Sequence, residues 1–569
     1  MNKKLPLRIL LASFLCCGSL MQGGVSAYAL SIDSPVDPAR VGEQLPVPQK
    51  PKPALLPPRQ HQNAAPSPIA GAEKITFPLE SVIIHGATLY PAERLQTLTA
   101  PYLHKTISVA QLYEMIAKIN QLYFDDGYIF SRAFLPPQSI DQGVVHIQVI
   151  EGYVAQIEVQ GLKPDFYPMR MALKNLSELG VLNIEELERQ MLLLNSLPGL
   201  SAKSVIEQAD PRSGGALGGL KIKVAFESQK SPLTLSFDNY GSKFIGPYQM
   251  GQSGSFYNIF GYMSTTDIRF FETTQIKELK YFSLDHEIPL NGDGTTLDLS
   301  ANFSRVRPGY TLLPNDINAF SRQFSLALSQ PVISSRSQSL NLKLQFERLN
   351  TYTKLLGARL YEDLYYVLSS TLNFDAADRH HGVHQLSLIV RQGLDLFDTR
   401  PSGSADLSRA EGRSDFTSYK FKYSHQHALP NNFALRATFS GQYAAMPLLS
   451  GEEFGYGGSE MGKAYNASEV TGDKGAAAQI ELNYTHPASW AVVQPYIYYD
   501  IGKTWNNDRA DPIASSAASA GLGTRLNLTM GVSADFTLAK PLTRPVETPF
   551  WGNPDDMQGR VSLSYKVNY

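Results

Sequence analysis

The chain has 569 residues, a formal net charge of −2 at pH 7 and a hydrophobic content of 43%. This charge gives no support for nucleic-acid binding, and a mean hydropathy of −0.18 excludes a bundle of membrane-spanning helices. The two cysteines, Cys16 and Cys17, lie in a segment that we expect to be removed. The mature chain therefore has no disulfide scaffold, catalytic cysteine or cysteine-based zinc site.

Residues 1–29 have the pattern of a secretory signal peptide. Lys3, Lys4 and Arg8 precede an apolar run over residues 9–20, and Ala27-Tyr28-Ala29 is a small-x-small cleavage site. The apolar run is shorter than the roughly 20 residues that a membrane helix needs. We therefore predict that the chain crosses the inner membrane and loses this segment.

Residues 30–74 are rich in proline, which is typical of a semi-rigid extended linker. Near its start, residues 37–45 predict a short helix that could plug a pore, with Asp37 as the cap and Pro38 at the first helical position.

Residues 75–152 and 153–230 predict two successive small α/β units. Each opens with a strand that ends in x-Gly and continues with helices and two further strands. Ser108 with Gln111 forms a capping box in the first unit, and Asn183 with Glu186 has the same pattern in the second.

From residue 231 to residue 569 the chain alternates between apolar and polar positions. The last strand shows the pattern clearly, because its odd-numbered positions are all apolar or aromatic: Val561, Leu563, Tyr565, Val567 and Tyr569. The chain has 29 tyrosines and 27 phenylalanines against 3 tryptophans, which suits aromatic girdles at two bilayer interfaces. At roughly 21 residues per strand and connection, this length predicts a transmembrane antiparallel β-barrel of about 16 strands.

Several motifs resemble the outer-membrane transporters of two-partner secretion, also called haemolysin secretion/activation proteins. In the first α/β unit these are Asp126-Gly127-Tyr128 and Leu135-Pro136-Pro137-Gln138, and in the second the run that ends Leu197-Pro198-Gly199. The resemblance implies that both units are periplasmic POTRA domains. It places partner recognition at Tyr128, Leu135, Pro136, Gln138, Leu197, Pro198 and Gly199.

Two barrel motifs extend the resemblance. The stretch 457–465 matches the family's long inward-folded loop, with Lys463 at the position of its cation and Tyr465 at that of its aromatic residue. Tyr498-Tyr499-Asp500-Ile501-Gly502 matches a motif on a barrel strand. The resemblance implies that Lys463 pairs with Asp500 and latches the loop inside the lumen, together with Tyr465, Tyr498 and Gly502. The residues alone, without the resemblance, favour the interpretation that Lys463 and Asp500 are ordinary charges facing a polar lumen.

The resemblance implies a protein translocase of the Gram-negative outer membrane that secretes, and in some members activates, a large exoprotein such as a haemolysin or adhesin. The expected partners are the N-terminal secretion domain of that exoprotein, periplasmic chaperones, outer-membrane lipid and the barrel assembly machinery. Tyr565, Val567 and Tyr569 would form the signal that this machinery reads. No catalytic, metal-binding or cofactor-binding motif occurs, so no enzyme is predicted. The alternatives are a barrel-insertion factor of the same superfamily, an outer-membrane hydrolase and a passive porin.

Overall fold

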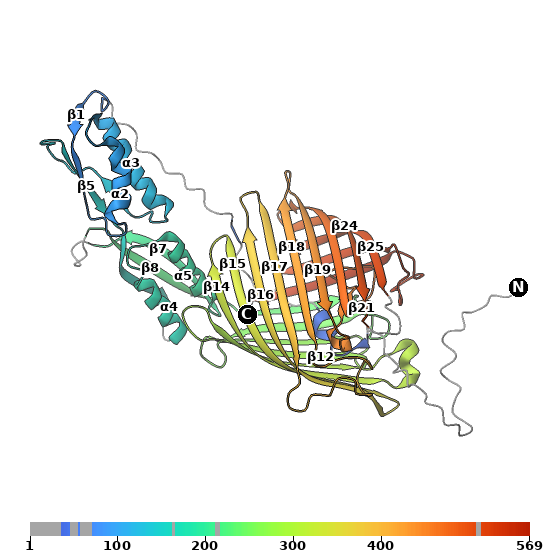
Figure 1. The fold of residues 1–569 in the computed structure, drawn as a ribbon. Coiled ribbons are helices and arrows are strands. Elements are labelled where there is room, and N and C mark those ends of the chain that lie inside the picture. The colour runs from blue at the N-terminus through green and yellow to red at the C-terminus, as the bar shows by residue number, and fades with distance from the viewer. Residues whose placement is uncertain are drawn as a thin grey trace, which may run out of the picture.

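The computed structural model describes residues 36–45, 55–56, 71–161, 166–210, 217–507 and 514–568. The predicted signal peptide, most of the proline-rich linker and Tyr569 lie outside this range. Within it, two α/β units lead into a large closed barrel (Figure 1). None of the helices in the described ranges is long and apolar enough to cross a membrane.

The first unit has a three-stranded sheet in the order β2-β5-β4, a two-stranded sheet of β1 and β3, and two main helices that cover its core. Its elements are β1 (Thr76–Leu79), β2 (Ser81–His85), α2 (Ala92–Thr99), β3 (Lys105–Ser108), α3 (Val109–Asp125), β4 (Arg132–Phe134) and β5 (Val144–Ile150). The predicted capping box is present, because the Ser108 side chain accepts from the Gln111 amide and the Gln111 side chain bonds back to Ser108.

The second unit repeats this plan with the sheet order β6-β8-β7. Its elements are β6 (Tyr153–Gly161), α4 (Tyr167–Ser177), α5 (Ile184–Ser196), β7 (Leu200–Gln208) and β8 (Gly219–Ser228). The second capping box is wrong in detail. The Asn183 side chain accepts from the Glu185 amide, whereas the Glu186 carboxylate accepts from Gln190 one turn further along α5.

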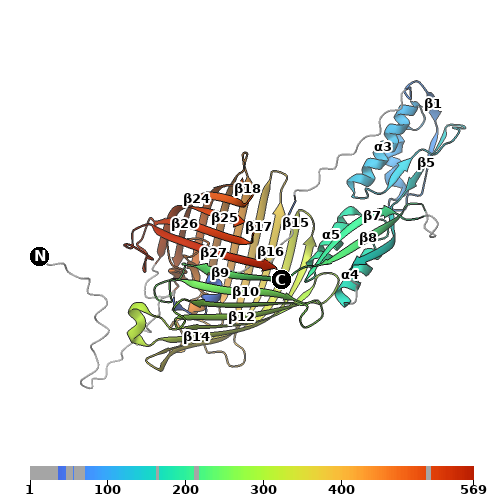
Figure 2. The ribbon, with the colours of Figure 1, turned by 180° about the vertical axis from the view of Figure 1, so that it is seen from behind.

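The second unit is docked on the barrel. Met263, in the turn between β10 and β11, is 3% exposed and belongs to the unit's hydrophobic core. Asn175 of α4 also donates to Asp293 in the turn between β12 and β13, at 3.1 Å. The turns at this end of the barrel therefore position the α/β units beside its mouth (Figures 1 and 2).

The barrel closes by pairing its first strand, β9, with its last, β27, and Figure 2 shows the two side by side. Because the two-residue β23 continues β22, the wall has 16 antiparallel strands, which confirms the predicted fold. The strands are β9 (Pro232–Asp238), β10 (Gln249–Tyr257), β11 (Thr265–Thr273), β12 (Leu279–Pro289), β13 (Thr296–Val306), β14 (Asn318–Ser334), β15 (Gln338–Leu355), β16 (Ala358–Ala377), β17 (Gly382–Leu394), β18 (Thr417–Ala428), β19 (Phe433–Ala444), β22 (Lys474–Tyr484), β23 (His486–Pro487), β24 (Ala491–Trp505), β25 (Ser515–Leu528), β26 (Val532–Pro541) and β27 (Gln558–Asn568).

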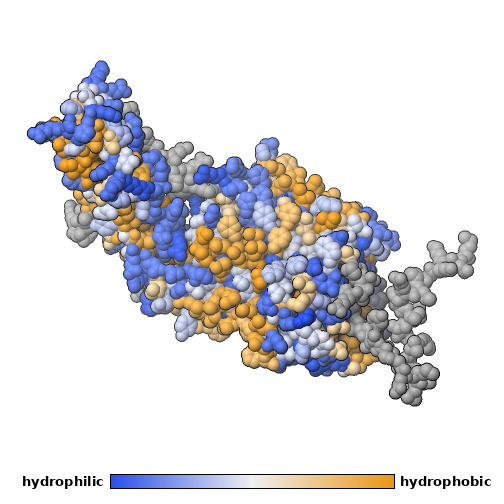
Figure 3. All heavy atoms as spheres, in the orientation of Figure 1, coloured by the Kyte–Doolittle hydropathy of each residue, from blue (hydrophilic) through white to orange (hydrophobic). Residues whose placement is uncertain are grey.

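The apolar positions of the strands form the outer face of the wall. On β27, Leu563 and Tyr565 are 39% and 44% exposed, and they pair with the outward-facing Phe237 and Leu235 of β9. Val567 has the same parity and is 40% exposed. Figure 3 shows hydrophobic surface spread widely over the barrel, as a membrane-spanning wall requires.

Two segments fill the lumen. One is residues 36–45, hereafter the N-terminal segment, which contains α1 (Val41–Gln44) and lies inside the barrel (Figure 1). The helix begins at Val41 and not at Pro38, because the Asp37 side chain accepts from the Ala39 amide and holds a turn before it. The other is the long loop between β19 and β22, which carries the short strands β20 (Phe454–Tyr456) and β21 (Val470–Gly472).

Candidate functional site in the barrel lumen

The inward-folded loop is a two-stranded ribbon with an irregular tip. β20 and β21 pair antiparallel, and residues 457–469 form the tip, hereafter the loop tip. Gly462 has a φ of +73°, and a Cβ there would lie 2.8 Å from the Gly457 Cα. Only glycine fits this conformation without strain, so the tip folds back tightly enough to reach the wall.

Asp500 of β24 is the centre of the contact between the loop and the wall. Its carboxylate is 0% exposed and accepts from the Tyr456 hydroxyl at 2.8 Å and from the Gly462 amide at 2.9 Å. The Ser519 hydroxyl and amide of β25 also donate to it, at 2.5 and 3.2 Å. The Gln479 side chain of β22 donates to it as well, at 3.5 Å. A buried carboxylate that accepts five hydrogen bonds, from both the loop and the wall, fixes the loop at a single place on the wall.

Gly502 lets the loop approach the wall closely. A Cβ at this position would lie 2.3 Å from Cδ2 of the Tyr456 ring. Because Gly502 has no side chain, the Tyr456 ring, whose hydroxyl donates to Asp500, can pack directly against this position of β24.

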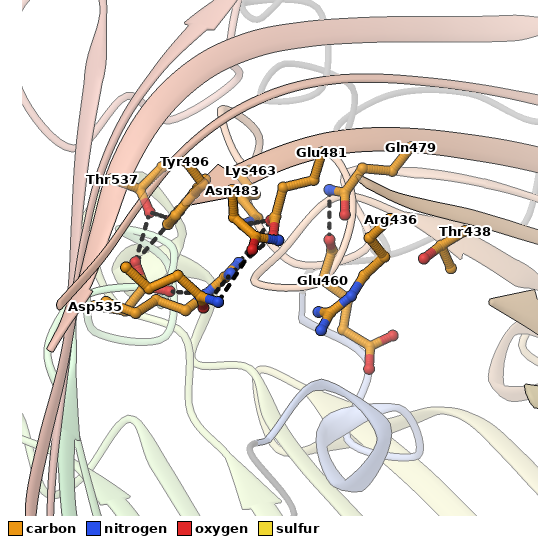
Figure 4. A network of polar contacts seen from close by, with 12 residues as sticks. Arg436, Thr438, Glu460, Lys463, Gln479, Glu481, Asn483, Tyr496, Asp535 and Thr537 are labelled. Carbon is orange, nitrogen blue, oxygen red and sulfur yellow. Dashed lines mark hydrogen bonds and ion pairs between the residues drawn. The ribbon is translucent and has the colours of Figure 1, made fainter. Parts of the chain in front are cut away.

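The direct ion pair expected between Lys463 and Asp500 is not formed. The Lys463 ammonium lies 4.0 Å from a carboxylate oxygen of Glu481 on β22, and 4.6 and 5.0 Å from the ring centres of Tyr496 and Tyr498. Asp500 already accepts its hydrogen bonds from the loop backbone and Tyr456, and Lys463 points into a neighbouring aromatic pocket instead. Figure 4 shows Lys463 beside Glu481 and Tyr496.

A network of charges on the wall backs this pocket. Glu481 is 1% exposed and accepts two hydrogen bonds from Arg525, at 2.6 and 2.8 Å. Arg525 also pairs with Asp535 at 3.3 Å and covers the Tyr496 ring at 4.1 Å. Arg525 is the bidentate partner of Glu481. Lys463 is therefore a second and more weakly bound cation beside a carboxylate that is already paired.

The two tyrosines predicted for the latch have different environments. Tyr465 is 0% exposed, and its hydroxyl donates to the backbone carbonyl of Ala518 at 2.9 Å. Tyr498 packs its ring against Lys463, and its buried hydroxyl has no hydrogen-bond partner among the described residues. Tyr465 thus fixes the loop directly, whereas Tyr498 supplies an aromatic surface.

Arg560 connects the loop tip to the strand pair that closes the barrel. It lies on β27, is 1% exposed, and donates to the Asn239 carbonyl just after β9 at 2.9 Å. It also reaches the Ala464 carbonyl and the Asn466 side chain of the loop, both at 3.4 Å. Sequence reasoning missed Arg560, Tyr456 and Glu481. The alternation of the strands places Arg560 and Glu481 on the lumen side, and this is the one sequence signal that could have identified these two residues.

The N-terminal segment contacts both the wall and the loop. Val36 and Val41 lie in an apolar cluster with wall residues such as Phe271 and Tyr281. The Ser450 hydroxyl of the loop donates to the Asp37 carboxylate at 2.6 Å, and Arg40 donates to Ser468 at 3.2 Å. The segment therefore packs on the wall through apolar side chains and bonds to the loop through its charges. The Ser304 hydroxyl of the wall also donates to the Pro38 carbonyl, at 2.6 Å.

Comparisons with known proteins identify the family. The family model "Haemolysin secretion/activation protein ShlB/FhaC/HecB" matches residues 218–526, more than half of the chain, and the ShlB-type POTRA domain model matches residues 77–152. The chain belongs to the ShlB/FhaC/HecB family. It is similar to the heme/hemopexin transporter protein HuxB of Haemophilus influenzae strain 86-028NP, with 24% identity over 86% of this chain and 89% of the relative. It is 22% identical to the outer membrane transporter CdiB of Dickeya dadantii, over 86% of this chain and 87% of the relative.

Solved structures show the same fold. CdiB from Escherichia coli superposes with a TM-score of 0.73 at 20% identity, covering 90% of this chain and 94% of that chain. CdiB from Acinetobacter baumannii gives a TM-score of 0.66 at 16% identity, covering 90% and 95%. The chain is thus a transporter of the two-partner secretion family, with its barrel in the outer membrane and its POTRA domains in the periplasm.

The recognition residues expected in the POTRA domains do not form one surface. Gln138 uses its side-chain amide to make two hydrogen bonds to the His146 backbone of β5, at 2.6 and 2.8 Å, and so continues the sheet where β4 ends. Tyr128 and Leu135 pack against the first domain's core, and Pro136 adjoins them in sequence. Leu197 and Gly199 lie in the second domain, where Leu197 is in the core and Gly199, next to Pro198, adjoins Tyr257 of the barrel.

Glu151 stabilises the first POTRA domain near its junction with the second. Burial alone would raise its pKa, but hydrogen bonds from Thr88, Tyr123 and the Leu89 amide outweigh burial and lower the pKa of this carboxyl. Its contribution to stability is therefore present above the pKa of the unfolded chain and is lost as the pH falls through the lowered pKa. In the described part of the chain, no group of three His, Cys, Asp or Glu residues could hold a metal ion.

Proposed function

We propose that this transporter secretes a large exoprotein, such as a haemolysin or adhesin, which crosses the lumen as an unfolded chain. Periplasmic chaperones deliver the exoprotein, and the barrel assembly machinery inserts the transporter itself, using the C-terminal strand with Tyr565, Val567 and Tyr569 as its signal. Transport requires no catalytic step by the transporter. Folding of the exoprotein outside the cell makes the movement directional.

The observation that carries this proposal is the arrangement of the lumen. The loop tip binds the β22–β27 side of the wall through buried groups such as Asp500 and Arg560. The N-terminal segment packs in its apolar cluster on β11–β14. A barrel whose lumen holds a fixed loop and a separate packed segment is suited to a gated passage for a chain, and these parts have no evident use in a passive porin.

We infer that the exoprotein binds first to the free edge of β2. On the other side of this sheet Gln138 already bonds to the β5 backbone, whereas β2 has no second neighbouring strand among the described residues. Ile83 of β2 is 42% exposed. An edge strand with an exposed apolar side chain can add an extended segment of another chain by strand pairing.

The test is export and crosslinking in cells that produce this transporter together with a candidate exoprotein. Ile83→Cys gives the predicted mature chain a single thiol, and a thiol crosslinker should join it to the exoprotein's N-terminal domain. Val205→Cys, on the edge strand β7 of the second domain and 57% exposed, is the matched control. Export without an adduct at position 83 would place recognition elsewhere, and absence of export from the unmodified transporter would contradict the function.

A further inference from the structure

Three arginines lie on adjacent strands of the outer wall, at the end of the barrel away from the POTRA domains. They are Arg305 on β13, Arg322 on β14 and Arg348 on β15. In the register of the sheet, Arg305 is opposite Phe320, Arg322 is opposite Phe303, and Arg348 is opposite Phe324. Each arginine is therefore one strand across and two residues along from the next, which gives a diagonal with a Cα spacing of about 8 Å.

The alternation of each strand shows that these side chains face outward. On β13, Ser304 points into the lumen, where it donates to the Pro38 carbonyl of the N-terminal segment. On β14 and β15, Gln323 bonds to Glu347, and Glu347 pairs with Arg391. Because neighbouring residues of a strand point to opposite faces, the arginines that adjoin these lumen-facing residues face the membrane.

The arginines lie just above the apolar band of the wall. The next outward-facing row toward the periplasm is apolar across β13–β16, and its members are paired in register: Leu299, Leu326, Phe346 and Leu368. A charged side chain on this face costs about 2–4 kcal/mol at mid-membrane and roughly 0–1 kcal/mol near the interfaces. The arginine diagonal therefore lies where lipid head groups meet the acyl chains.

The protein leaves these guanidinium groups incompletely paired. The Arg305 Nε is buried and has no hydrogen-bond partner among the described residues, and its guanidinium lies over the Phe320 ring at 5.0 Å. Arg322 is exposed, and within the described ranges its side chain forms no hydrogen bond or ion pair. Arg348 donates to the Tyr366 hydroxyl at 3.2 Å and pairs with the half-exposed Asp398 at 3.5 Å.

We propose that this diagonal binds the phosphate groups of a phosphorylated glycolipid in the outer leaflet of the outer membrane. Guanidinium groups bind phosphate with paired, charge-assisted hydrogen bonds. Phe303, Phe320 and Phe324 alternate with the arginines and would hold the sugar and upper acyl region, as aromatic side chains do at membrane interfaces. The apolar row below takes the acyl chains. A soluble anion has no acyl chains to contact that apolar row, so we infer that the ligand is a lipid.

Native mass spectrometry of the purified full chain in detergent tests the site. The probes are bisphosphorylated lipid A, the same lipid with both phosphates removed, phosphatidylglycerol and inorganic phosphate. Bisphosphorylated lipid A should bind best, and Arg322→Gln should weaken it roughly tenfold, the equivalent of about one charge-assisted hydrogen bond. Lys343→Gln on β15, a lumen-facing residue that pairs with Asp298 at 3.6 Å, is the matched control and should bind as the parent does.

Equal binding of the dephosphorylated lipid or of phosphatidylglycerol would overturn the proposal, and so would tight binding of inorganic phosphate alone. A second measurement excludes misfolding as the cause. In a zwitterionic lipid the triple variant Arg305→Gln, Arg322→Gln, Arg348→Gln should unfold at the same or a higher temperature than the parent, because it loses outward-facing charges. Added lipid A should raise the unfolding temperature of the parent only, and equal stabilisation of both proteins would contradict the site.

Discussion

The two segments that fill the lumen are held in different ways. The loop between β19 and β22 is continuous with the wall at both ends and buries polar contacts against it, including those to Asp500 and Arg560. The N-terminal segment packs on the wall through Val36 and Val41, while Asp37 and Arg40 bond to Ser450 and Ser468 of the loop. The loop therefore has its own site on the wall, whereas the segment depends in part on the loop. We infer an order of release in which the segment leaves first and the loop stays.

The largest effect is expected from Asp500→Ala. The substitution leaves the buried Tyr456 hydroxyl, the Gly462 amide and the Ser519 hydroxyl without an acceptor, at a cost of about 1–3 kcal/mol for each donor. Because the segment bonds to the loop, both should be displaced. Export should fall strongly and single-channel conductance in planar bilayers should rise, while heat-modifiable migration in gels still shows a folded barrel.

Asp500→Asn is the control for this substitution. It keeps the shape of the side chain and one acceptor oxygen but removes the charge, so it should retain more export than the alanine variant. If both variants export normally and conduct as the parent does, the loop is not held by Asp500.

A steric change should have a smaller effect at the same place. Gly502→Val puts a side chain where even a Cβ would lie 2.3 Å from the Tyr456 ring, so the ring must move away from Asp500. The Gly462 amide keeps its bond, and the loss of export should be partial. Ile501→Val, on the outward-facing neighbour, should export as the parent does, and an equal loss in both variants would point to general damage of β24.

The sequence predicts the wall better than the contents of the lumen. Strand alternation identifies Leu563 and Tyr565 as outward-facing because the period of a strand fixes the face of every side chain. Alternation also places Asp500 inward, but it cannot say which loop group will reach it. The resemblance suggested Lys463, and the structure gives Tyr456 and the Gly462 amide instead, because the loop backbone turns back at Gly462. Contacts made by backbone amides and by residues distant in sequence leave no pattern in the sequence.

Loosening the N-terminal segment tests whether the loop keeps its place on the wall without it. Val41 is 3% exposed in its apolar cluster, and Val41→Asp would bury a carboxylate among apolar side chains, which makes the packed position unfavourable. Conductance should rise, whereas export should remain close to that of the parent because the loop keeps its contacts with the wall. Ala39→Ser is a milder change in the same segment and should leave conductance low. Loss of export in Val41→Asp would show that the loop also depends on the segment.

The smallest effect is expected at Lys463, although the resemblance to the family implies a latch there. Glu481 already has two hydrogen bonds from Arg525, and the Lys463 ammonium lies 4.0 Å from it. Lys463→Met would keep an unbranched apolar side chain against the Tyr496 and Tyr498 rings and remove only the second cation. We expect export within a factor of about two of the parent, because Glu481 keeps both hydrogen bonds from Arg525 and no buried carboxylate loses its only cation. Arg525→Met should have the larger effect, because it leaves Glu481 buried without its bidentate partner.

Export should be measured for both variants beside Asp500→Ala. If Lys463→Met abolished export as completely as Asp500→Ala does, the lysine would be part of the latch, and the contacts of the Gly462 amide and Tyr456 with Asp500 would not suffice to hold the loop.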